Sequence, residues 1–377
     1  MLTVQRDVAL LGTGRALPER RVSNAELRGL VRNYDEGSGD FALWVDRVTH
    51  IQDRYWIDPA RESAGSLGET AARQALERSG VAASEVDHLI FCSFTYNEIF
   101  PGEHVKIVRN LGMTCGAFQM TAACAGSLYG MNLARALVMS GQCRNVMVVG
   151  VECLSRCTNF DDPVTAILFG DSAGAMLIGR KSDGRPTGFA GTPILRTEYS
   201  ADAIFMMNGN APTQDRISAT DDKLALRPML AMQGGPRVLR SAVTRMADAV
   251  VECLGFTPQD LKDESPALRD VLSRVKLIPH QANGRIVDGL QEKLGLPREN
   301  VYRTIYFTGN CSAATNVFTL DYAVREGNLD RIAPAEGSQE MGRIVKTGAP
   351  IANGDLVVMV SIGAGYSYGA MAFVHAY

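Results

Sequence analysis

A single cysteine stands at a predicted helix start. Cys124 lies in the small-residue run Thr121-Ala-Ala-Cys-Ala-Gly-Ser-Leu-Tyr-Gly130, and a helical pattern follows over residues 131–139. The first turn of a helix leaves backbone N–H groups unpaired and carries about half a positive charge, which favours a thiolate. We therefore expect a lowered pKa and a sulfur nucleophile at Cys124. The alternative is a buried structural cysteine, the usual place of a free thiol.

Two further motifs supply polar partners for this thiol. A short apolar run from Val275 leads into Leu277-Ile-Pro-His-Gln-Ala-Asn283, which predicts a strand with His280 and Asn283 at its carboxyl end. A second small-residue cluster at a predicted helix start is Gly309-Asn-Cys-Ser-Ala-Ala314, headed by Asn310. A Cys, a His and an Asn at strand-to-helix junctions make a candidate nucleophile with its partners. Taken singly, the His is typical of a core residue and Asn310 of a helix cap.

These motifs occur in the order found in the ketoacyl synthase III family of the thiolase superfamily, which the chain resembles. The matching segments are Gly12-Thr-Gly-Arg-Ala-Leu-Pro18, Ala122-Ala-Cys-Ala-Gly126, Phe169-Gly-Asp-Ser-Ala-Gly-Ala175, Pro279-His-Gln-Ala-Asn283, Gly309-Asn-Cys-Ser-Ala-Ala314 and Gly363-Ala-Gly-Tyr-Ser-Tyr-Gly369. The resemblance implies a thiolase-like α/β fold of five layers, αβαβα, built from two duplicated halves. It also implies an acyltransferase of the condensing type, a 3-oxoacyl synthase III-like enzyme.

The resemblance assigns a role to each polar group. Cys124 would take an acyl group from a thioester, and a malonyl-type thioester would lose carbon dioxide and attack that acyl group. The N–H groups of Cys124 and Ala364 would form the oxyanion hole, although the family usually has Gly in place of Ala364. His280 and Asn310 would donate hydrogen bonds to the enolate oxygen. The 3-oxoacyl product would serve fatty acid, polyketide or specialised metabolism.

Two motifs are expected to support these groups. Asn283 would bond the backbone and orient His280. The segment Phe169-Gly-Asp-Ser-Ala-Gly-Ala175 is interpreted as structural, with glycines in tight turns and Asp171 bonding backbone amides.

The donor thioester is less clearly indicated. Trp44 and Arg47 resemble a coenzyme A clamp in which an indole and a guanidinium stack on adenine. A further arginine of that clamp is replaced by Pro163, so acyl-coenzyme A and an acyl carrier protein both remain candidate donors. Phe100 matches a family aromatic that reaches across a dimer to close the acyl pocket, which implies a homodimer.

Two other groups of residues are expected to contact substrate or partner. Within the polar segment 199–235, the tunnel-lining candidates are Phe205, Met207 and Met232. An ordinary surface excursion is the alternative there. A basic patch for an acidic acyl carrier protein is predicted from Arg237, Arg240, Arg245 and Arg285. The alternative for the patch is a solvated helix face.

Composition narrows the class of protein. The chain has 377 residues, 46% of them hydrophobic, and a net charge of −3, which gives no general case for nucleic acid binding. No apolar stretch reaches the ~18 residues of a membrane span, and the first residues do not form a signal peptide pattern. The eight cysteines lack Cys-x-x-Cys pairs. We therefore expect a cytoplasmic protein with reduced thiols, no membrane, no metal and no cofactor beyond its thioester substrates.

Strands and helices alternate along the chain, which indicates a layered α/β fold with buried strands. A helix is predicted at 66–78, with strands at 86–94 and 144–150. The helix after Asn310 and the strand at 356–361 echo the helix after Cys124 and the strand at 145–150. We assign residues 1–185 to a half that carries the cysteine and 186–377 to a half that carries the His and Asn. Residues 331–353 are interpreted as an irregular insertion.

Two other functions fit the same motifs. One is an acyltransferase of this fold that moves the acyl group from Cys124 to an oxygen, nitrogen or sulfur nucleophile, with His280 as general base. Such a transfer would release no carbon dioxide. The other is a non-catalytic partner subunit, in which Cys124 would react no faster than an ordinary thiol.

Overall fold

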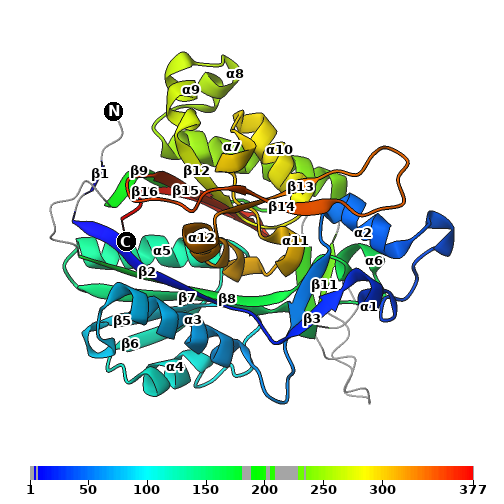
Figure 1. The fold of residues 1–377 in the computed structure, drawn as a ribbon. Coiled ribbons are helices and arrows are strands. Elements are labelled where there is room, and N and C mark those ends of the chain that lie inside the picture. The colour runs from blue at the N-terminus through cyan, green and yellow to red at the C-terminus, as the bar shows by residue number, and fades with distance from the viewer. Residues whose placement is uncertain are drawn as a thin grey trace.

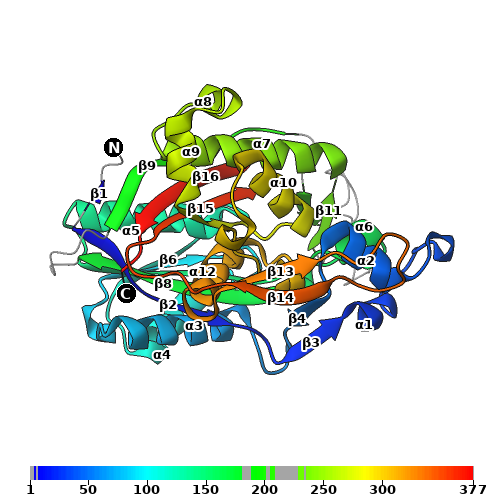
Figure 2. The same cartoon turned by 45° about the horizontal axis from the view of Figure 1, so that its top comes forward.

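In a computed structural model of the protein, two five-stranded sheets are stacked with helices between them and on both outer faces (Figure 1). The structure describes residues 4–5, 7–180, 188–200, 204–208, 228–232 and 235–376. Figure 2 shows the same layers turned so that the helices above the second sheet come forward.

The first sheet has the strand order β2-β8-β7-β5-β6, and the second has the order β1-β9-β16-β15-β12. The strands of the first sheet are β2 (Val8–Ala16), β8 (Asp171–Arg180), β7 (Asn145–Cys153), β5 (His88–Cys92) and β6 (Gly116–Met120). Those of the second are β1 (Val4–Gln5), β9 (Gly188–Thr197), β16 (Ser367–Val374), β15 (Leu356–Gly363) and β12 (Val275–Pro279).

Four consecutive strands follow the same pattern in both sheets. In the first sheet, β2 and β8 pair antiparallel, β8 and β7 antiparallel, and β7 and β5 parallel. In the second sheet, β9 and β16, then β16 and β15, pair antiparallel, and β15 and β12 pair parallel. The predicted architecture of two duplicated halves is therefore confirmed. The predicted boundary at residue 185 lies outside the described residues and stays a prediction.

The helices complete five layers (Figures 1 and 2). Between the sheets lie α5 (Gly126–Met139) and α12 (Thr315–Glu326). The outer face of the first sheet is covered by α3 (Ala64–Ser79) and α4 (Glu103–Leu111), and that of the second by α7 (Gly235–Cys253) and α10 (Gly284–Leu294).

Small residues let the outer helix α3 lie directly on the first sheet. The helix begins after Ser63, whose side chain accepts a hydrogen bond from Ser66 N, and ends at Gly80 with a left-handed φ of 69°. A Cβ on Gly14 of β2 would stand 2.0 Å from the carbonyl oxygen of Ala71, so only glycine allows this approach. The helix predicted at 66–78 is confirmed and is slightly longer.

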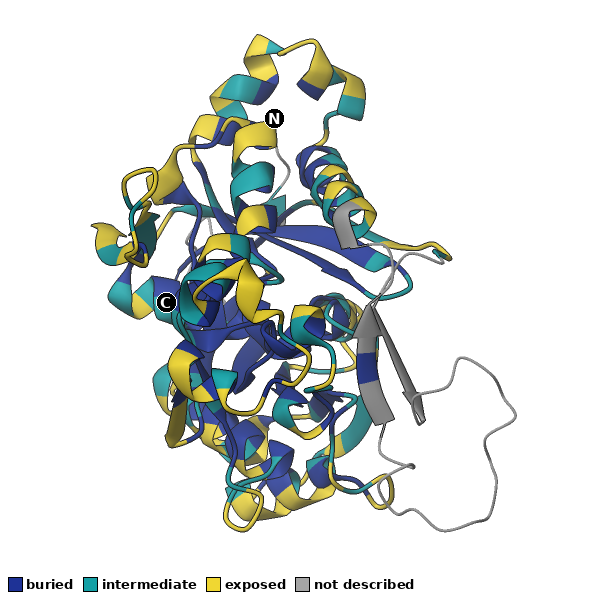
Figure 3. Cartoon of the chain, turned by 90° about the vertical axis from the view of Figure 1, so that its right-hand side faces the viewer, coloured by how far each residue is buried: buried dark blue, intermediate teal, exposed yellow. Residues whose placement is uncertain are grey.

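Strand β7 is buried on both faces. Figure 3 shows that buried residues gather in the interior of the molecule, while exposed residues lie on the outer helices and loops. The strand lies in the middle of its sheet, between the α5–α12 layer and α3, and only its first residue is partly exposed. A strand covered on both sides needs apolar residues at successive positions and not only at alternate ones. This explains why its continuous apolar run was visible in the sequence.

Three two-stranded antiparallel sheets extend from the layers. They are β3 (Arg20–Ser23) with β4 (Asp53–Trp56), β10 (Ile204–Asn208) with β11 (Pro228–Met232), and β13 (Asn328–Ile332) with β14 (Arg343–Gly348). The interpretation of 331–353 as irregular was wrong in part, because β14 lies within it. That strand is largely exposed, so its sequence shows no clear apolar alternation.

The remaining helices are short. They are α1 (Asn24–Arg28), α2 (Phe41–Thr49), α6 (Pro163–Ala166), α8 (Pro258–Lys262), α9 (Pro266–Ser273) and α11 (Ile305–Thr308). Across the described part of the chain, no helix combines the length and the apolar character that crossing a bilayer requires. A cytoplasmic location stays a prediction.

Candidate active site

Cys124 lies in the turn that joins β6 to α5, two residues before the helix begins at Gly126. Ala123 takes a left-handed φ of 46°, and Gly126 N donates a hydrogen bond to Ala123 O at 2.9 Å. The end of β15 packs against this turn: a Cβ on Gly363 would stand 2.8 Å from Cys124 N. Small side chains are therefore required around the cysteine, and the predicted helix-start position is confirmed.

The thiol of Cys124 is not ionised at rest. Its side chain is half-buried, and burial raises the pKa of the thiol to about 11. A hydrogen bond from Ser312 Oγ to Cys124 Sγ, 3.3 Å long, acts in the opposite direction. The expectation of a lowered pKa was wrong, because loss of solvent outweighs the groups that stabilise the anion. Loading an acyl group therefore requires a base.

His280 is placed to be that base. It follows β12, and its N–H donates to Val360 O at 2.8 Å, which fixes it beside β15. Its ring Nδ1 lies 2.6 Å from Thr315 Oγ1, and the Thr315 hydroxyl donates to Ser312 O at 2.9 Å. With its one hydrogen used, the hydroxyl accepts from Nδ1–H, so this network leaves Nε2 as the unprotonated nitrogen. Burial lowers the pKa of His280 to about 3, so the ring is neutral.

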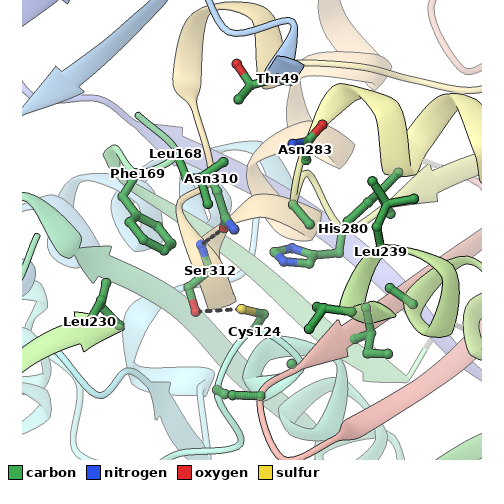
Figure 4. Close-up of a pocket in the computed structure, with 18 of the residues that line it drawn as sticks. Thr49, Cys124, Leu168, Phe169, Leu230, Leu239, His280, Asn283, Asn310 and Ser312 are labelled. Atoms are coloured by element: carbon green, nitrogen blue, oxygen red, sulfur yellow. Dashed lines mark hydrogen bonds between the residues drawn. The ribbon is translucent and has the colours of Figure 1, made fainter. Parts of the chain in front are cut away.

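Asn310 is held by the first half of the molecule. Its N–H donates to Leu168 O at 2.8 Å, and its carbonyl accepts from Gly170 N at 3.1 Å. Its side-chain Oδ1 accepts from Ser312 N at 2.9 Å, which turns the amide nitrogen away from Ser312 (Figure 4). A Cβ on Gly170 would stand 2.1 Å from Thr308 O, so this contact between the halves depends on glycine.

The segment that bonds Asn310 continues into Asp171, which has the predicted structural role. Its carboxylate accepts hydrogen bonds from Ile57 N at 2.9 Å and from Ser155 N at 2.8 Å. Burial raises the pKa of Asp171 to about 6. The motif at 169–175 therefore braces the site through Asp171, and its first residue, Phe169, lines the same cavity as Cys124.

One cavity of about 640 Å³ brings the predicted catalytic groups together. Cys124, His280 and Asn310 all line it (Figure 4). Ala364, which directly follows β15, lines it too. The groups come from four segments that are far apart in the sequence. Their common position is the central geometric expectation from the sequence, and the structure meets it.

The cavity walls are mainly apolar. Trp44 lines the cavity as predicted, and Leu230 of β11 lines it without having been predicted. Other unpredicted apolar residues of the wall are Val48, Phe94, Leu154, Val164, Ile167, Leu168, Val238, Leu239, Ala242 and Ile286. The side chains of the predicted tunnel residues Phe205, Met207 and Met232 lie outside the described part of the structure, so their role stays a prediction.

Asn283 connects α10 to α2. Its Nδ2 donates to Val48 O at 3.2 Å, and its Oδ1 accepts from Arg285 N at 2.8 Å. It bonds the backbone as predicted, but the His280 ring is hydrogen-bonded through Nδ1 to Thr315. The prediction that Asn283 orients His280 is corrected accordingly.

The predicted donor clamp lies at the side of the cavity. Trp44 is half-buried, with its ring 5.2 Å from that of Tyr34. Arg47 is exposed on the same helix, and its carbonyl accepts from Arg285 Nε at 3.1 Å. Pro163 begins α6, and the next residue, Val164, lines the cavity with 52% of its surface exposed.

The predicted docking arginines separate into two groups. Arg237, Arg240 and Arg285 are exposed. Arg245 is instead half-buried: it pairs with Glu198 at 2.8 Å and lies over the ring of Tyr366, 4.9 Å from its centroid. The prediction for Arg245 is corrected, because its guanidinium braces the loop after β15.

Phe100 is 91% exposed and is not part of the cavity wall of its own chain. Its predicted role across a dimer stays a prediction. Ser312 and Thr315, in contrast, contact the catalytic groups directly and were missed. The only sequence signal was the position of Ser312 inside the motif at 309–314, where no role had been given to it.

Family models match both halves of the chain. Residues 118–202 match 3-oxoacyl-[acyl-carrier-protein (ACP)] synthase III, and residues 274–334 match the C-terminal model of the same enzyme. The chain is 36% identical over 329 residues to a beta-ketoacyl-[acyl-carrier-protein] synthase III of Acidiphilium cryptum, covering 87% of this chain and 93% of that protein.

Solved structures agree in fold over nearly the whole length. The 3-oxoacyl-[acyl-carrier-protein] synthase III from Aquifex aeolicus has a TM-score of 0.75 at 27% identity, covering 98% of this chain and 100% of that one. The priming beta-ketosynthase of the R1128 polyketide biosynthetic pathway has a TM-score of 0.76 at 29% identity, covering 98% and 96%. The predicted thiolase-like fold is confirmed.

Proposed function

The chain belongs to the 3-oxoacyl-[acyl-carrier-protein] synthase III family, and from this premise we propose how its residues condense an acyl thioester with a malonyl-type thioester. The observation that carries the proposal is the convergence of a thiol, a neutral imidazole and a carboxamide on one apolar cavity. Each group matches one step of a decarboxylating Claisen condensation.

The first step loads the acyl group onto Cys124. Nε2 of His280 accepts the thiol proton, and the sulfur attacks the thioester carbonyl. The N–H groups of Cys124 and Ala364 stabilise the resulting oxyanion, a contribution of roughly 3 kcal/mol per donor. The donor's thiolate then leaves and takes the proton from His280. The sulfur exchanges one thioester for another, so little bond energy is lost.

The second step forms the carbon–carbon bond. The malonyl-type thioester loses carbon dioxide, and negative charge collects on its thioester oxygen. The Asn310 amide and the His280 ring donate hydrogen bonds to that oxygen. For His280 this requires the tautomer with its hydrogen on Nε2, which the ring reaches after acyl loading by losing the Nδ1 proton to solvent and taking one from solvent at Nε2. The Thr315 hydroxyl then turns from Ser312 O and donates to Nδ1. The carbanion attacks the acyl group, and Cys124 leaves as a thiolate that takes a proton from solvent.

Neutral donors suit this step because they cannot quench the carbanion. An imidazole with a pKa of about 3 carries no acidic proton at neutral pH, and a carboxamide carries none either. The apolar walls also keep water from the acyl-enzyme. An acid in place of either group would protonate the carbanion before it reached the acyl carbon.

An acyl carrier protein or coenzyme A would deliver the thioesters. Exposed Arg237, Arg240 and Arg285 offer positive charge on α7 and α10 for an acidic carrier. A homodimer would cover β6, the edge strand of the first sheet, and the exposed Ile99 and Phe100. Sedimentation velocity measures the dimer directly, and a monomer at micromolar concentration would contradict it.

The reaction is tested by carbon dioxide release together with product analysis. The enzyme is given an acyl thioester and a malonyl thioester, and mass spectrometry follows the 3-oxoacyl product. We expect equal amounts of carbon dioxide and product, and no 3-oxoacyl product from a Cys124→Ala variant. Transfer of the acyl group to an oxygen, nitrogen or sulfur acceptor without carbon dioxide would support the acyltransferase instead. No turnover with any thioester pair would support a non-catalytic subunit.

A further inference from the structure

Ser312 is hydrogen-bonded to Cys124, to Asn310 and, through Thr315, to His280. Its hydroxyl donates to Cys124 Sγ at 3.3 Å, and its N–H donates to Asn310 Oδ1 at 2.9 Å (Figure 4). Its carbonyl accepts from the Thr315 hydroxyl at 2.9 Å, and that hydroxyl contacts the His280 ring at 2.6 Å. The residue is 1% exposed, although it lines the cavity that contains Cys124.

We propose that the Ser312 hydroxyl is a further catalytic residue, which stabilises the negative charge on Cys124 whenever its sulfur is a thiolate. The inference rests on the proposed function, since it concerns the same nucleophile. It assigns the backbone of Ser312 a separate duty, which is to position Asn310 and, through Thr315, His280.

The Ser312 hydroxyl supplies a side-chain hydrogen-bond donor to the sulfur of Cys124. Burial opposes the thiolate, and Glu152 opposes it further once its own buried carboxyl is ionised. The groups that favour it are the Ser312 hydroxyl, which contributes more, and the N–H of Cys124 itself. A hydrogen bond to an anion is about twice as strong as one between neutral groups. The bond is therefore stronger to the thiolate than to the thiol or the thioester, which is the condition for catalysis.

The backbone of this turn does not require a serine. Ser312 has a left-handed φ of 46°, and Ala123, which precedes Cys124, has the same value in the corresponding turn of the other half. An alanine therefore fits this conformation without a hydroxyl. The hydroxyl at 312 is thus separable from the fold of the turn, and Ser312→Ala is a clean test.

Negative charge lies on two different atoms in the course of the reaction. Negative charge lies on the sulfur during acyl loading and again when the thiolate leaves after condensation. During decarboxylation it lies on the enolate oxygen, which Asn310 and His280 face. Removing the hydroxyl should slow the steps at sulfur and leave decarboxylation unchanged.

The test measures alkylation of Cys124 by iodoacetamide as a function of pH, with the site identified by peptide mass spectrometry. For Ser312→Ala we expect the pH midpoint to rise by about one unit and the rate at neutral pH to fall about tenfold. Acyl loading should fall by a similar factor. In a Cys124→Ala background, malonyl thioester decarboxylation should be equal with and without Ser312→Ala.

Two further variants keep the test decisive. Ser361→Ala removes a hydroxyl that donates to Cys124 O at 2.9 Å rather than to the sulfur, so its alkylation midpoint should match the wild type. Ser312→Gly removes the hydroxyl and relieves the left-handed φ, and it should behave like Ser312→Ala. An unchanged midpoint in both Ser312 variants, or an equal shift in Ser361→Ala, would overturn the proposal. Alkylation needs no condensation activity, so it remains readable if the proposed function fails.

Discussion

Two turns at helix starts meet at the active site, one from each half, and they share one backbone design. In each, a residue with φ of 46° is followed by the residue before the helix cap: Ala123 with Cys124, and Ser312 with Ala313. Each turn is closed by two successive backbone hydrogen bonds. They run from Ala125 N to Ala122 O and Gly126 N to Ala123 O, and from Ala314 N to Cys311 O and Thr315 N to Ser312 O.

The side chains differ where the backbones agree. The first turn places a thiol at Cys124, where the second has the buried Ala313. The second turn places a hydroxyl at Ser312, where the first has Ala123. The hydroxyl then bonds the thiol across the two halves. Duplication supplied two equivalent turns, and different side chains made one the nucleophile and the other its hydrogen-bonding partner.

Each of the two turns also packs against a strand of the opposite half. Gly363 of β15 lies against the Cys124 turn, where a Cβ would stand 2.8 Å from Cys124 N. Gly150 of β7 lies against the other turn, where a Cβ would stand 2.7 Å from Ala313 O. The equivalent strands β7 and β15 therefore each support the turn of the opposite half, so neither half can form the site alone.

The largest effect is expected from the cysteines of the two turns. Cys124→Ala should reduce condensation about 10⁴-fold or more, because no acyl-enzyme can form. Cys311→Ala in the other turn should leave acyl loading intact, since Cys311 is fully buried and burial raises the pKa of its thiol. Acylated protein quantified by intact mass checks both. Loss of loading in Cys311→Ala would contradict the assignment.

The next effect separates the two chemical steps. Asn310→Ala should slow carbon dioxide release by about 10²–10³-fold, because a donor to the enolate oxygen is lost, and acyl loading should change much less. Asn283→Ala is the matched control, since its amide bonds Val48 O and Arg285 N rather than a reacting atom. An equal fall in carbon dioxide release in both variants would contradict a direct role of the Asn310 amide in decarboxylation.

A smaller effect tests the packing of each turn against a strand of the opposite half. Gly363→Ala and Gly150→Ala each force a methyl group against backbone, which should lower the free energy of unfolding by about 1–3 kcal/mol. Gly363→Ala presses directly on Cys124 N, whereas Gly150→Ala presses on Ala313, beside the partner Ser312, so Gly363→Ala should slow acyl loading more. Urea unfolding and loading rates are the measurements. Equal loading rates for the two folded variants would mean that the turns are not supported as described.

The smallest effect on activity is expected at Glu152, at the end of β7. Burial raises the pKa of its carboxyl to about 8 from the usual 4.5. The folded state therefore keeps a proton that the unfolded chain releases, and wild-type stability is lost as pH rises through this window. Glu152→Gln cannot titrate at this position, so its free energy of unfolding should fall less than that of the wild type when the pH rises from 4.5 to about 8. Urea unfolding at these two pH values is the measurement. An equal fall in the wild type and the variant would contradict the raised pKa.

The sequence predicted the catalytic groups because each lies in a contiguous motif. Cys124 and His280 each follow a strand and precede a helix as expected, whereas Asn310 follows the short helix α11 rather than a strand, and each of the three lies in a motif that indicated a shared position. The buried strand β7 was equally visible, because a strand covered on both faces is apolar throughout.

The features that the sequence did not reveal arise from contacts between segments that are far apart in the chain. The contact of Ser312 with Cys124 joins residues 188 positions apart. The raised pKa of Cys124 follows from burial, which the helix-start pattern does not report. Arg245 looked like a surface charge, but Glu198 and Tyr366 come from other elements and engage it.

The central claim is that Cys124 carries the acyl group and releases it by condensation. The most direct measurement is intact and peptide mass spectrometry of the enzyme after exposure to a panel of acyl thioesters, followed by a malonyl thioester. The account predicts one acyl group on Cys124, which disappears with the release of one carbon dioxide and the appearance of one 3-oxoacyl product. An acyl group on another residue, or one on Cys124 that a malonyl thioester does not remove, would contradict it.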